Sequence, residues 1–283
     1  MTLAFHKVAV IGAGAMGRGI AQIAVQAGSQ VWLYDTQPEA TRKAREAVCQ
    51  QWDKLQEKGR LTADTVAGHK ARLMEATSLQ DLAGCELVVE AIVEKLDVKK
   101  AVFSDLEKVL PASAVLVTNT SSLSVTAIAA ALQRPGQFAG YHFFNPVPLM
   151  KVVEVIAGLK TDPAVCQRLS DYARQMGHTP VNAQDTPGFI VNHAGRGYGT
   201  EALRIVSEGI ADFATIDRIL RDQMGFKLGP FELFDLTALD VSHHVIESIY
   251  HQYYEEPRYR PNVITAQRLA GGVVGKKVGE GFY

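Results

Sequence analysis

The feature that most constrains this chain is a glycine-rich turn near the N-terminus. Gly12, Gly14 and Gly17 have the spacing G-x-G-x-x-G, follow the apolar run 7–11 "KVAVI" and open a helical pattern. The next apolar run ends in an acidic residue, Asp35. The first glycine allows a tight turn, the second lets a pyrophosphate approach the backbone, and the third lets the helix pack against the strand. In this context the spacing predicts a dinucleotide site, with the phosphates at the start of the helix.

Asp35 indicates which dinucleotide binds. Its carboxylate can accept hydrogen bonds from the adenosine ribose hydroxyls and would repel a 2′-phosphate, so the sequence favours NAD over NADP. The weaker alternative is a glycine turn that only connects strand and helix, with Asp35 as a surface carboxylate.

Apolar runs alternate with helical patterns through the first half of the chain, which predicts an α/β fold with a doubly wound, mostly parallel sheet. Strands are expected at 7–11, 30–35, 85–92, 114–119, 138–144 and 151–156. Helices are expected at 16–28, 38–58, 98–109 and shortly after Ser124.

The pattern changes at the breaker 186–188, "TPG". Helix-length segments then dominate, at about 189–209, 215–224, 230–252 and 262–270. We therefore expect an N-terminal domain over 1–185 and a small all-α domain over 186–283. The abrupt stop at Tyr283, without a polar tail, indicates one module of a longer protein.

Composition excludes several classes of function. The 283 residues are 47% hydrophobic and 21% charged, with a formal net charge of −1, so no global field favours nucleic acid or a membrane surface. Cys49, Cys85 and Cys166 form no C-x-x-C pair, which predicts reduced thiols in a cytoplasmic setting. No signal peptide and no bilayer-length apolar run is visible.

A histidine and a glutamate stand out in the stretch "HFFNPVPLMKVVEVI". Removal of hydride from an alcohol needs a base for the hydroxyl proton, and imidazole suits this role near neutral pH. Two strands joined by a proline-broken turn can bring Glu154 back to His142, where a carboxylate would orient the ring and stabilise its charged form. The residues alone leave two alternatives open: Glu154 points to water, or His142 is a satisfied core residue.

Six segments together resemble the 3-hydroxyacyl-CoA dehydrogenase family: "GAGAMGRGIA", "NTSSL", "HFFNPVPLMKVVEVI", "DTPGFIVN", "LGPFELFDL" and "GKKVGEGFY". They occur in the family order between Lys7 and Tyr283. The resemblance implies an N-terminal Rossmann-like domain and a C-terminal helical domain that mediates homodimerisation. It also implies oxidation of (S)-3-hydroxyacyl-CoA to 3-ketoacyl-CoA with NAD.

The resemblance implies roles for individual residues. His142 is the general base and Glu154 its partner, Ser121 contacts the substrate hydroxyl and the nicotinamide, and Asn192 holds the acyl group. The positions implied around NAD are Gly12, Gly14, Ala15, Met16, Gly17, Asp35, Glu94, Lys99, Asn119, Ser121, Asn145 and Lys277.

Simpler interpretations remain for these residues. Ser121 or Ser122 can cap the following helix, and Asn192 can cap or end the irregular stretch before it. Lys99 is typical of a solvated helix face, and Lys277 of a solubilising tail.

Two departures from the family pattern bear on the substrate. The family places a serine and a lysine seven residues apart on the helix 38–58 for CoA, and ungapped placement gives Gln51 and Lys58. After Asn192 the chain reads "HAGRGYGTEA", whose glycines suggest close backbone packing or a wider pocket. This second pattern is similar to larger, two-module dehydrogenases of phenylacetate breakdown, which act on 3-hydroxyadipyl-CoA.

Other functions compete with this one. Another β-hydroxyacid dehydrogenase would share the two-domain plan but use a catalytic lysine or cysteine. A non-catalytic NAD(H)-binding sensor or structural protein would bind the dinucleotide without turnover. His243, His244 and His251 lack an H-E-x-x-H pattern and a nearby cysteine, so no metal site is expected.

Overall fold

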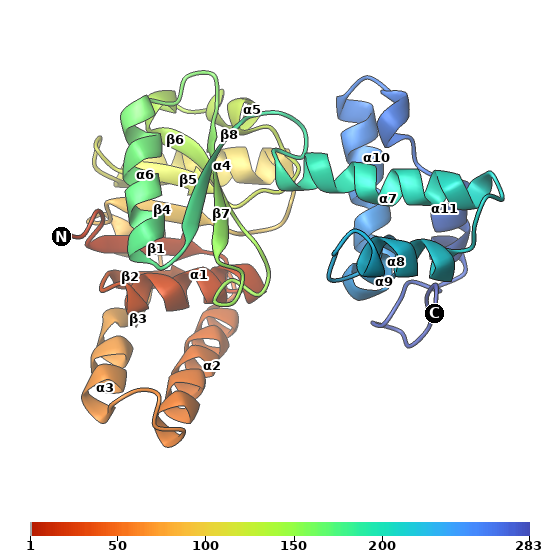
Figure 1. Ribbon diagram of the computed structural model, residues 1–283. Coiled ribbons are helices and arrows are strands. Elements are labelled where there is room, and N and C mark those ends of the chain that lie inside the picture. The colour runs from red at the N-terminus through yellow and green to blue at the C-terminus, as the bar shows by residue number, and fades with distance from the viewer. Residues whose placement is uncertain (1) are drawn as a thin grey trace. The chain divides into compact units, whose positions relative to one another are not determined.

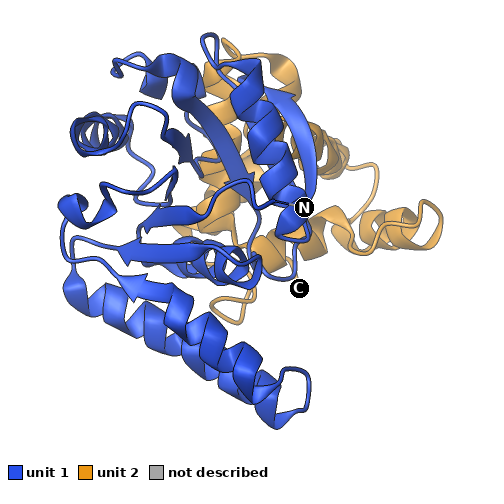
Figure 2. Cartoon of the chain, turned by 90° about the vertical axis from the view of Figure 1, so that its left-hand side faces the viewer, with its two compact units in different colours: residues 1–186 blue, residues 187–283 orange. Residues whose placement is uncertain are grey.

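The computed structural model describes residues 2–283, which form two compact units (Figure 2). Unit 1 ends at Thr186 and unit 2 comprises Pro187–Tyr283, while the sequence placed the boundary between 185 and 186. Within the described residues, no helix combines the length and apolar character needed to cross a membrane.

Unit 1 is built on an eight-stranded sheet of order β3-β2-β1-β4-β5-β6-β7-β8 (Figure 1). The strands are β1 Lys7–Ile11, β2 Gln30–Tyr34, β3 Leu73–Glu75, β4 Leu87–Glu90, β5 Val115–Thr118, β6 Phe138–Phe143, β7 Val152–Ala157 and β8 Thr179–Gln184. Neighbouring strands are parallel except for the antiparallel pair β6–β7. The predicted doubly wound, mostly parallel sheet is confirmed.

Helices cover the sheet and extend beyond it. They are α1 Ala15–Gln26, α2 Pro38–Glu57, α3 Ala63–Arg72, α4 Leu96–Val109, α5 Val125–Ala129 and α6 Pro163–Gln175, with 3₁₀ turns at Leu79–Leu82 and Pro135–Gln137. The paired helices α2 and α3 project from the sheet (Figure 1). The sequence analysis did not predict α3, β3, α6 or β8. The last of these carries Pro180, which an edge strand tolerates.

Alternation along β6 and β7 assigns their side chains to two faces. Tyr141, Val153 and Val155 belong to the main core, which includes side chains of α1 and α6. His142 and Glu154, at the intervening positions, therefore point to the opposite face. A glutamate among valines is thus compatible with a fully apolar core on the other side of the strand.

Unit 2 is all-helical, as predicted. Its helices are α7 Val191–Ser207, α8 Phe213–Asp222, α9 Pro230–Thr237, α10 Leu239–Gln252 and α11 Val263–Ala270, with a 3₁₀ turn at Pro257–Tyr259. Its core gathers around Phe231, Phe234 and Phe282, with Leu203 and Ile246 in the same cluster.

The prediction of one helix over 230–252 is wrong, because the chain breaks between α9 and α10. Ala238 has a φ of 64°, outside the helical region. The Leu239 N–H, which in a continuous helix would bond the Asp235 carbonyl, instead bonds Val274. The Asp235 carbonyl accepts from Lys276. The C-terminal tail has therefore replaced the helical hydrogen bonds at this point.

We expect Ala238→Gly to stabilise the protein by about 1 kcal/mol, because relief of a strained positive φ outweighs the entropy cost of glycine. Ala266→Gly, at an exposed position of α11, is the control and should lose up to about 1 kcal/mol. Chemical denaturation measures both changes. Equal destabilisation by the two substitutions would contradict the assigned strain.

Candidate active site

The glycine turn at the end of β1 has a geometry that only glycine fits at two positions. Gly12 has a φ of 101°, and a Cβ there would lie 2.5 Å from the Ala91 carbonyl oxygen. A Cβ on Gly17 would collide with the Gly12 carbonyl oxygen. The Gly12 N–H donates to Tyr34 at 2.8 Å, which ties the turn to β2.

The start of α1 fits a pyrophosphate. Gly14 is the N-cap and provides no side-chain cap, and the first turn, which contains Ala15 and Met16, has no acidic residue. A Cβ on Gly14 would meet no atom within 4 Å, so the backbone is accessible there. The unsatisfied N–H groups and the positive end of the helix dipole suit an anion.

Asp35 supports the same turn from the end of β2. Its carboxylate accepts the Ala13 N–H at 2.9 Å and the Gln37 N–H at 3.0 Å. A carboxylate has about four lone-pair positions, so hydrogen bonding to a ribose is compatible with these contacts. Together the turn, the helix start and Asp35 fit NAD.

The unit 1 site residues follow strands that end at one edge of the sheet. Gly12 follows β1, Glu94 lies beyond β4, Ser121 follows β5, and His142 lies near the end of β6. The strands β2 and β3 lie on one side of β1, and the chain then crosses back to β4 on its other side (Figure 1). Such a reversal of strand order is the switch point at which doubly wound sheets bind ligands.

His142 and Glu154 are direct partners in the antiparallel register of β6 and β7. His142 Nδ1 lies 2.7 Å from Glu154 Oε2, with the histidine 5% exposed and the glutamate 0% exposed. Opposite residues on antiparallel strands share a face, which explains the contact. A carboxylate accepts hydrogen bonds, so Nδ1 carries the proton in this contact. The alternative that Glu154 points to water is wrong.

Asn119 joins the ends of β4, β5 and β6. Its side-chain oxygen accepts the Phe143 N–H at 2.9 Å, and its own N–H donates to the Glu90 carbonyl at 2.8 Å. The backbone beside His142 is thereby fixed to the strand that precedes Ser121. Asn145, just after β6, is exposed.

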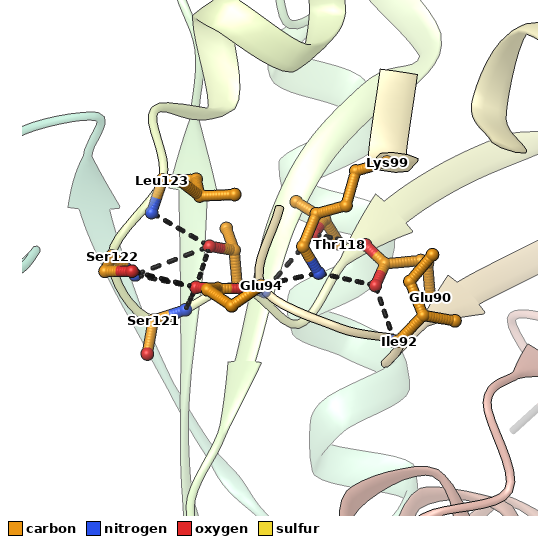
Figure 3. Close-up of polar contacts among 9 residues, drawn as sticks. Glu90, Ile92, Glu94, Lys99, Thr118, Ser121, Ser122 and Leu123 are labelled. Carbon is orange, nitrogen blue, oxygen red and sulfur yellow. Dashed lines mark hydrogen bonds and ion pairs between the residues drawn. The ribbon is translucent and has the colours of Figure 1, made fainter. Parts of the chain in front are cut away.

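A buried charge network lies next to the loop 119–124, which follows β5 and contains Ser121 and is called the Ser121 loop (Figure 3). Lys99 is 1% exposed, and its ammonium lies 2.5 Å from Glu90 Oε1 and 3.2 Å from Glu94 Oε2. Glu90 is 0% exposed and also accepts the Thr118 hydroxyl at 2.7 Å. The interpretation of Lys99 as part of a solvated helix face is wrong.

Glu94 in turn holds the loop after β5 (Figure 3). Its Oε1 accepts the N–H groups of Ser121 at 3.0 Å and Ser122 at 3.2 Å, and the hydroxyl of Thr120 at 2.5 Å. Ser124 caps α5 through its side chain, so neither Ser121 nor Ser122 is the cap of that helix.

These contacts set the ionisation of Glu94. Partial burial raises the pKa of its carboxyl, but the charge of Lys99 and the hydrogen bonds from the Ser121 loop outweigh burial and lower the pKa below its ordinary value. The loop is therefore held by an ionised carboxylate.

Sequence reasoning missed Glu90, Thr118 and Thr120. Glu90 ends a strand that is otherwise apolar, and a buried carboxylate needs a partner. This is the signal that singled out Glu154, and it was present at Glu90 as well.

Unit 2 contains Asn192 and Lys277. The N-cap of α7 is Ile190, so Asn192 lies within the first turn of the helix and is not its cap. The Lys277 ammonium lies 2.5 Å from Asp240 Oδ2. The glycines of α7 differ in their surroundings: a Cβ on Gly199 would lie 2.7 Å from the Phe234 ring, whereas one on Gly195 would meet nothing within 4 Å.

The two positions that the family resemblance implies for CoA binding lie on or next to α2. Gln51 is on the helix, Lys58 is its C-cap, and both are exposed. Their separation of seven residues is about two helical turns, so they share a face. In residues 2–283, no group of three or more His, Cys, Asp or Glu side chains is arranged to hold a metal ion.

The chain matches two family models that together span most of its length. Residues 7–186 match "3-hydroxyacyl-CoA dehydrogenase, NAD binding domain", and residues 188–283 match "3-hydroxyacyl-CoA dehydrogenase, C-terminal domain".

Individual relatives agree with these matches. The chain is 43% identical over 283 residues to the 3-hydroxyadipyl-CoA dehydrogenase of Escherichia coli (strain K12), covering 100% of this chain but 60% of that protein. It is 40% identical to a probable 3-hydroxybutyryl-CoA dehydrogenase of Deinococcus radiodurans, covering 98% and 99%. The crystal structure of 3-hydroxybutyryl-CoA dehydrogenase from E. coli K12 superposes with a TM-score of 0.96 at 43% identity, covering 99% of this chain and 59% of the other.

The lowered pKa of Glu94 predicts a pH-dependent stability. A carboxyl whose pKa is lower in the folded state stabilises the fold above its unfolded pKa, and this contribution is lost as pH falls through the folded pKa. Glu94→Gln should therefore destabilise most at pH 7, and its difference from the wild type should shrink below the ordinary glutamate pKa of about 4.3. Urea unfolding from pH 7 to pH 3 measures this, with the exposed Glu57→Gln as control. A pH-independent difference would contradict the assignment.

Proposed function

The chain belongs to the 3-hydroxyacyl-CoA dehydrogenase family, and on this premise we propose that it oxidises (S)-3-hydroxyacyl-CoA to 3-ketoacyl-CoA with NAD. The observation that carries the proposal is the buried contact of 2.7 Å between His142 Nδ1 and Glu154 Oε2. It lies near the end of β6, at the sheet edge that also holds the glycine turn.

The reaction separates a proton from a hydride. Bound NAD supplies the hydride acceptor. His142 takes the C3 hydroxyl proton at Nε2. At the same time the C3–H bond breaks, its hydrogen leaves as hydride with both electrons, and the C3–O bond becomes a carbonyl. Glu154 holds Nδ1–H and stabilises the imidazolium that results. In the reverse direction His142 returns the proton.

Other residues are proposed to contact the substrate. Ser121 contacts the substrate hydroxyl and the nicotinamide. The hydrogen bond from the Ser121 N–H to Glu94 supports a fixed position for Ser121. Asn192 contacts the acyl portion from the first turn of α7. Lys58 contacts the CoA phosphates; Gln51, which replaces the family's serine, is the weaker candidate.

The substrate class is the finer part of the proposal. We assign 3-hydroxyadipyl-CoA, an intermediate of phenylacetate breakdown, alongside shorter acyl chains. The glycine-rich start of α7 and the name of the 43% identical E. coli relative support this assignment.

We further propose that the protein acts in the cytoplasm as a homodimer formed through unit 2. Large apolar side chains exposed on that unit support an interface. They include Ile219, Met224, Phe226, Leu236 and Val241.

His142→Gln should reduce kcat by about 10²- to 10⁴-fold, because the variant lacks a general base. Glu154→Gln should also reduce kcat, because the imidazolium loses its counter-charge. Oxidation of NADH with acetoacetyl-CoA measures turnover, and NADH fluorescence titration measures cofactor affinity, which should change little. Normal turnover by His142→Gln would refute the assigned role.

The choice of oxidised substrate separates the competing functions. Acetoacetyl-CoA should support NADH oxidation, whereas short free ketoacids should not, because they lack the CoA portion. Preference for free ketoacids would instead identify another β-hydroxyacid dehydrogenase. Tight NADH binding without turnover at any acyl chain length would identify a sensor or structural protein.

A further inference from the structure

Arg196 of α7 has an incompletely satisfied guanidinium. Its Nε is buried and has no hydrogen-bond partner within unit 2. Its Nη1 donates only to the Ser242 carbonyl, at 3.5 Å, which is the limit of a hydrogen bond. A guanidinium offers five N–H donors, so most of its capacity is not met by these contacts within unit 2.

Arg196 also lacks a counter-ion. No carboxylate of unit 2 lies within ion-pair distance of its guanidinium, and burial, with no acidic neighbour to offset it, lowers its pKa. Arg204, on the same helix, pairs with Glu208, and Arg221 pairs with Glu232. A partly buried cation without an anion is costly unless an anion from outside unit 2 pairs with it.

The position of Arg196 relates it to the proposed acyl contact. Asn192 precedes it by four residues on α7, so the two side chains share a face about 6 Å apart along the axis. Gly195 lies between them and adds no bulk, since a Cβ there would meet no atom within 4 Å. An acyl chain that contacts Asn192 can therefore extend toward Arg196.

We infer that Arg196 binds the terminal carboxylate of an ω-carboxyacyl-CoA and so selects dicarboxylic over monocarboxylic acyl chains. The inference rests on the proposed function, because that function places the acyl chain at Asn192. Arginine suits this task, since its planar fork matches a carboxylate with two parallel hydrogen bonds. In 3-hydroxyadipyl-CoA the carboxylate carbon is three C–C bonds of about 1.5 Å each from C3, a reach compatible with the separation of the two residues.

A matched pair of substrates tests the inference. 3-Hydroxyadipyl-CoA and 3-hydroxyhexanoyl-CoA have equal chain lengths and differ only at the terminal carbon. Arg196→Met should lower kcat/KM for the adipyl substrate by about 10- to 100-fold, mainly through KM, and leave the hexanoyl substrate nearly unchanged. Arg196→Lys keeps the charge without the fork and should fall between the wild type and Arg196→Met.

Arg204→Met is the control on the same helix, because Arg204 is exposed and already paired with Glu208. It should leave the ratio of the two kcat/KM values as in the wild type. Urea unfolding of all variants shows whether Arg196 acts through stability, and a purely structural role would lower activity on both substrates together.

The outcomes are distinguishable. Equal losses on both substrates, or no loss on the adipyl substrate, would overturn the role of Arg196 while leaving the dehydrogenase function intact. A wild type that oxidises neither substrate would overturn the proposed function itself. If Arg196→Met fails to fold, adipyl-CoA and hexanoyl-CoA can be compared as inhibitors of the wild type and of Arg196→Lys. A preference for adipyl-CoA that weakens in the lysine variant supports the inference, and equal inhibition overturns it.

Discussion

Two fully buried carboxylates, Glu90 and Glu154, impose the constraint on which the arrangement of unit 1 depends. A carboxylate removed from water is costly unless donors or an opposite charge compensate it. In both cases a residue directly opposite on the neighbouring strand contributes: His142 across β6–β7 for Glu154, and Thr118 across β4–β5 for Glu90. The strand register therefore fixes these polar groups, and a slip by one residue would leave both carboxylates without their cross-strand partners.

The Glu90–Thr118 and His142–Glu154 pairs lie at the same end of the sheet, because β4, β5 and β6 are parallel neighbours. Glu90 compensates Lys99, Lys99 is also near Glu94, and Glu94 holds the loop that contains Ser121. Asn119 connects this side to the backbone of β6, next to His142. The proposed base and the proposed substrate-contact loop thus belong to one hydrogen-bonded framework. Loss of one member leaves another buried charge unpaired, which is more damaging than loss of a surface ion pair.

Local patterns in the sequence predicted the parts of the fold that depend on neighbours along the chain. Alternation of apolar runs with helical patterns predicted the parallel sheet, and the breaker near Pro187 predicted the change to helices. Parts that depend on distant residues were not predictable in this way. The break at Ala238 arises because Lys276 takes the Asp235 carbonyl. Lys99 is buried because Glu90 and Glu94 lie around it, although its local sequence is typical of a solvated helix face.

The same electrostatic criterion separates the buried cations of the two units. Lys99 is compensated within the fold, so its burial is explained by the structure of unit 1 alone, and nothing beyond the chain is needed to account for it. Arg196 is not compensated within unit 2, although its helix pairs Arg204 with a carboxylate one turn away. Ordinary packing would favour an apolar residue at a half-buried position that lacks an anion. The arginine at this position, one turn from Asn192, is more simply explained by an anionic group that belongs to the proposed substrate.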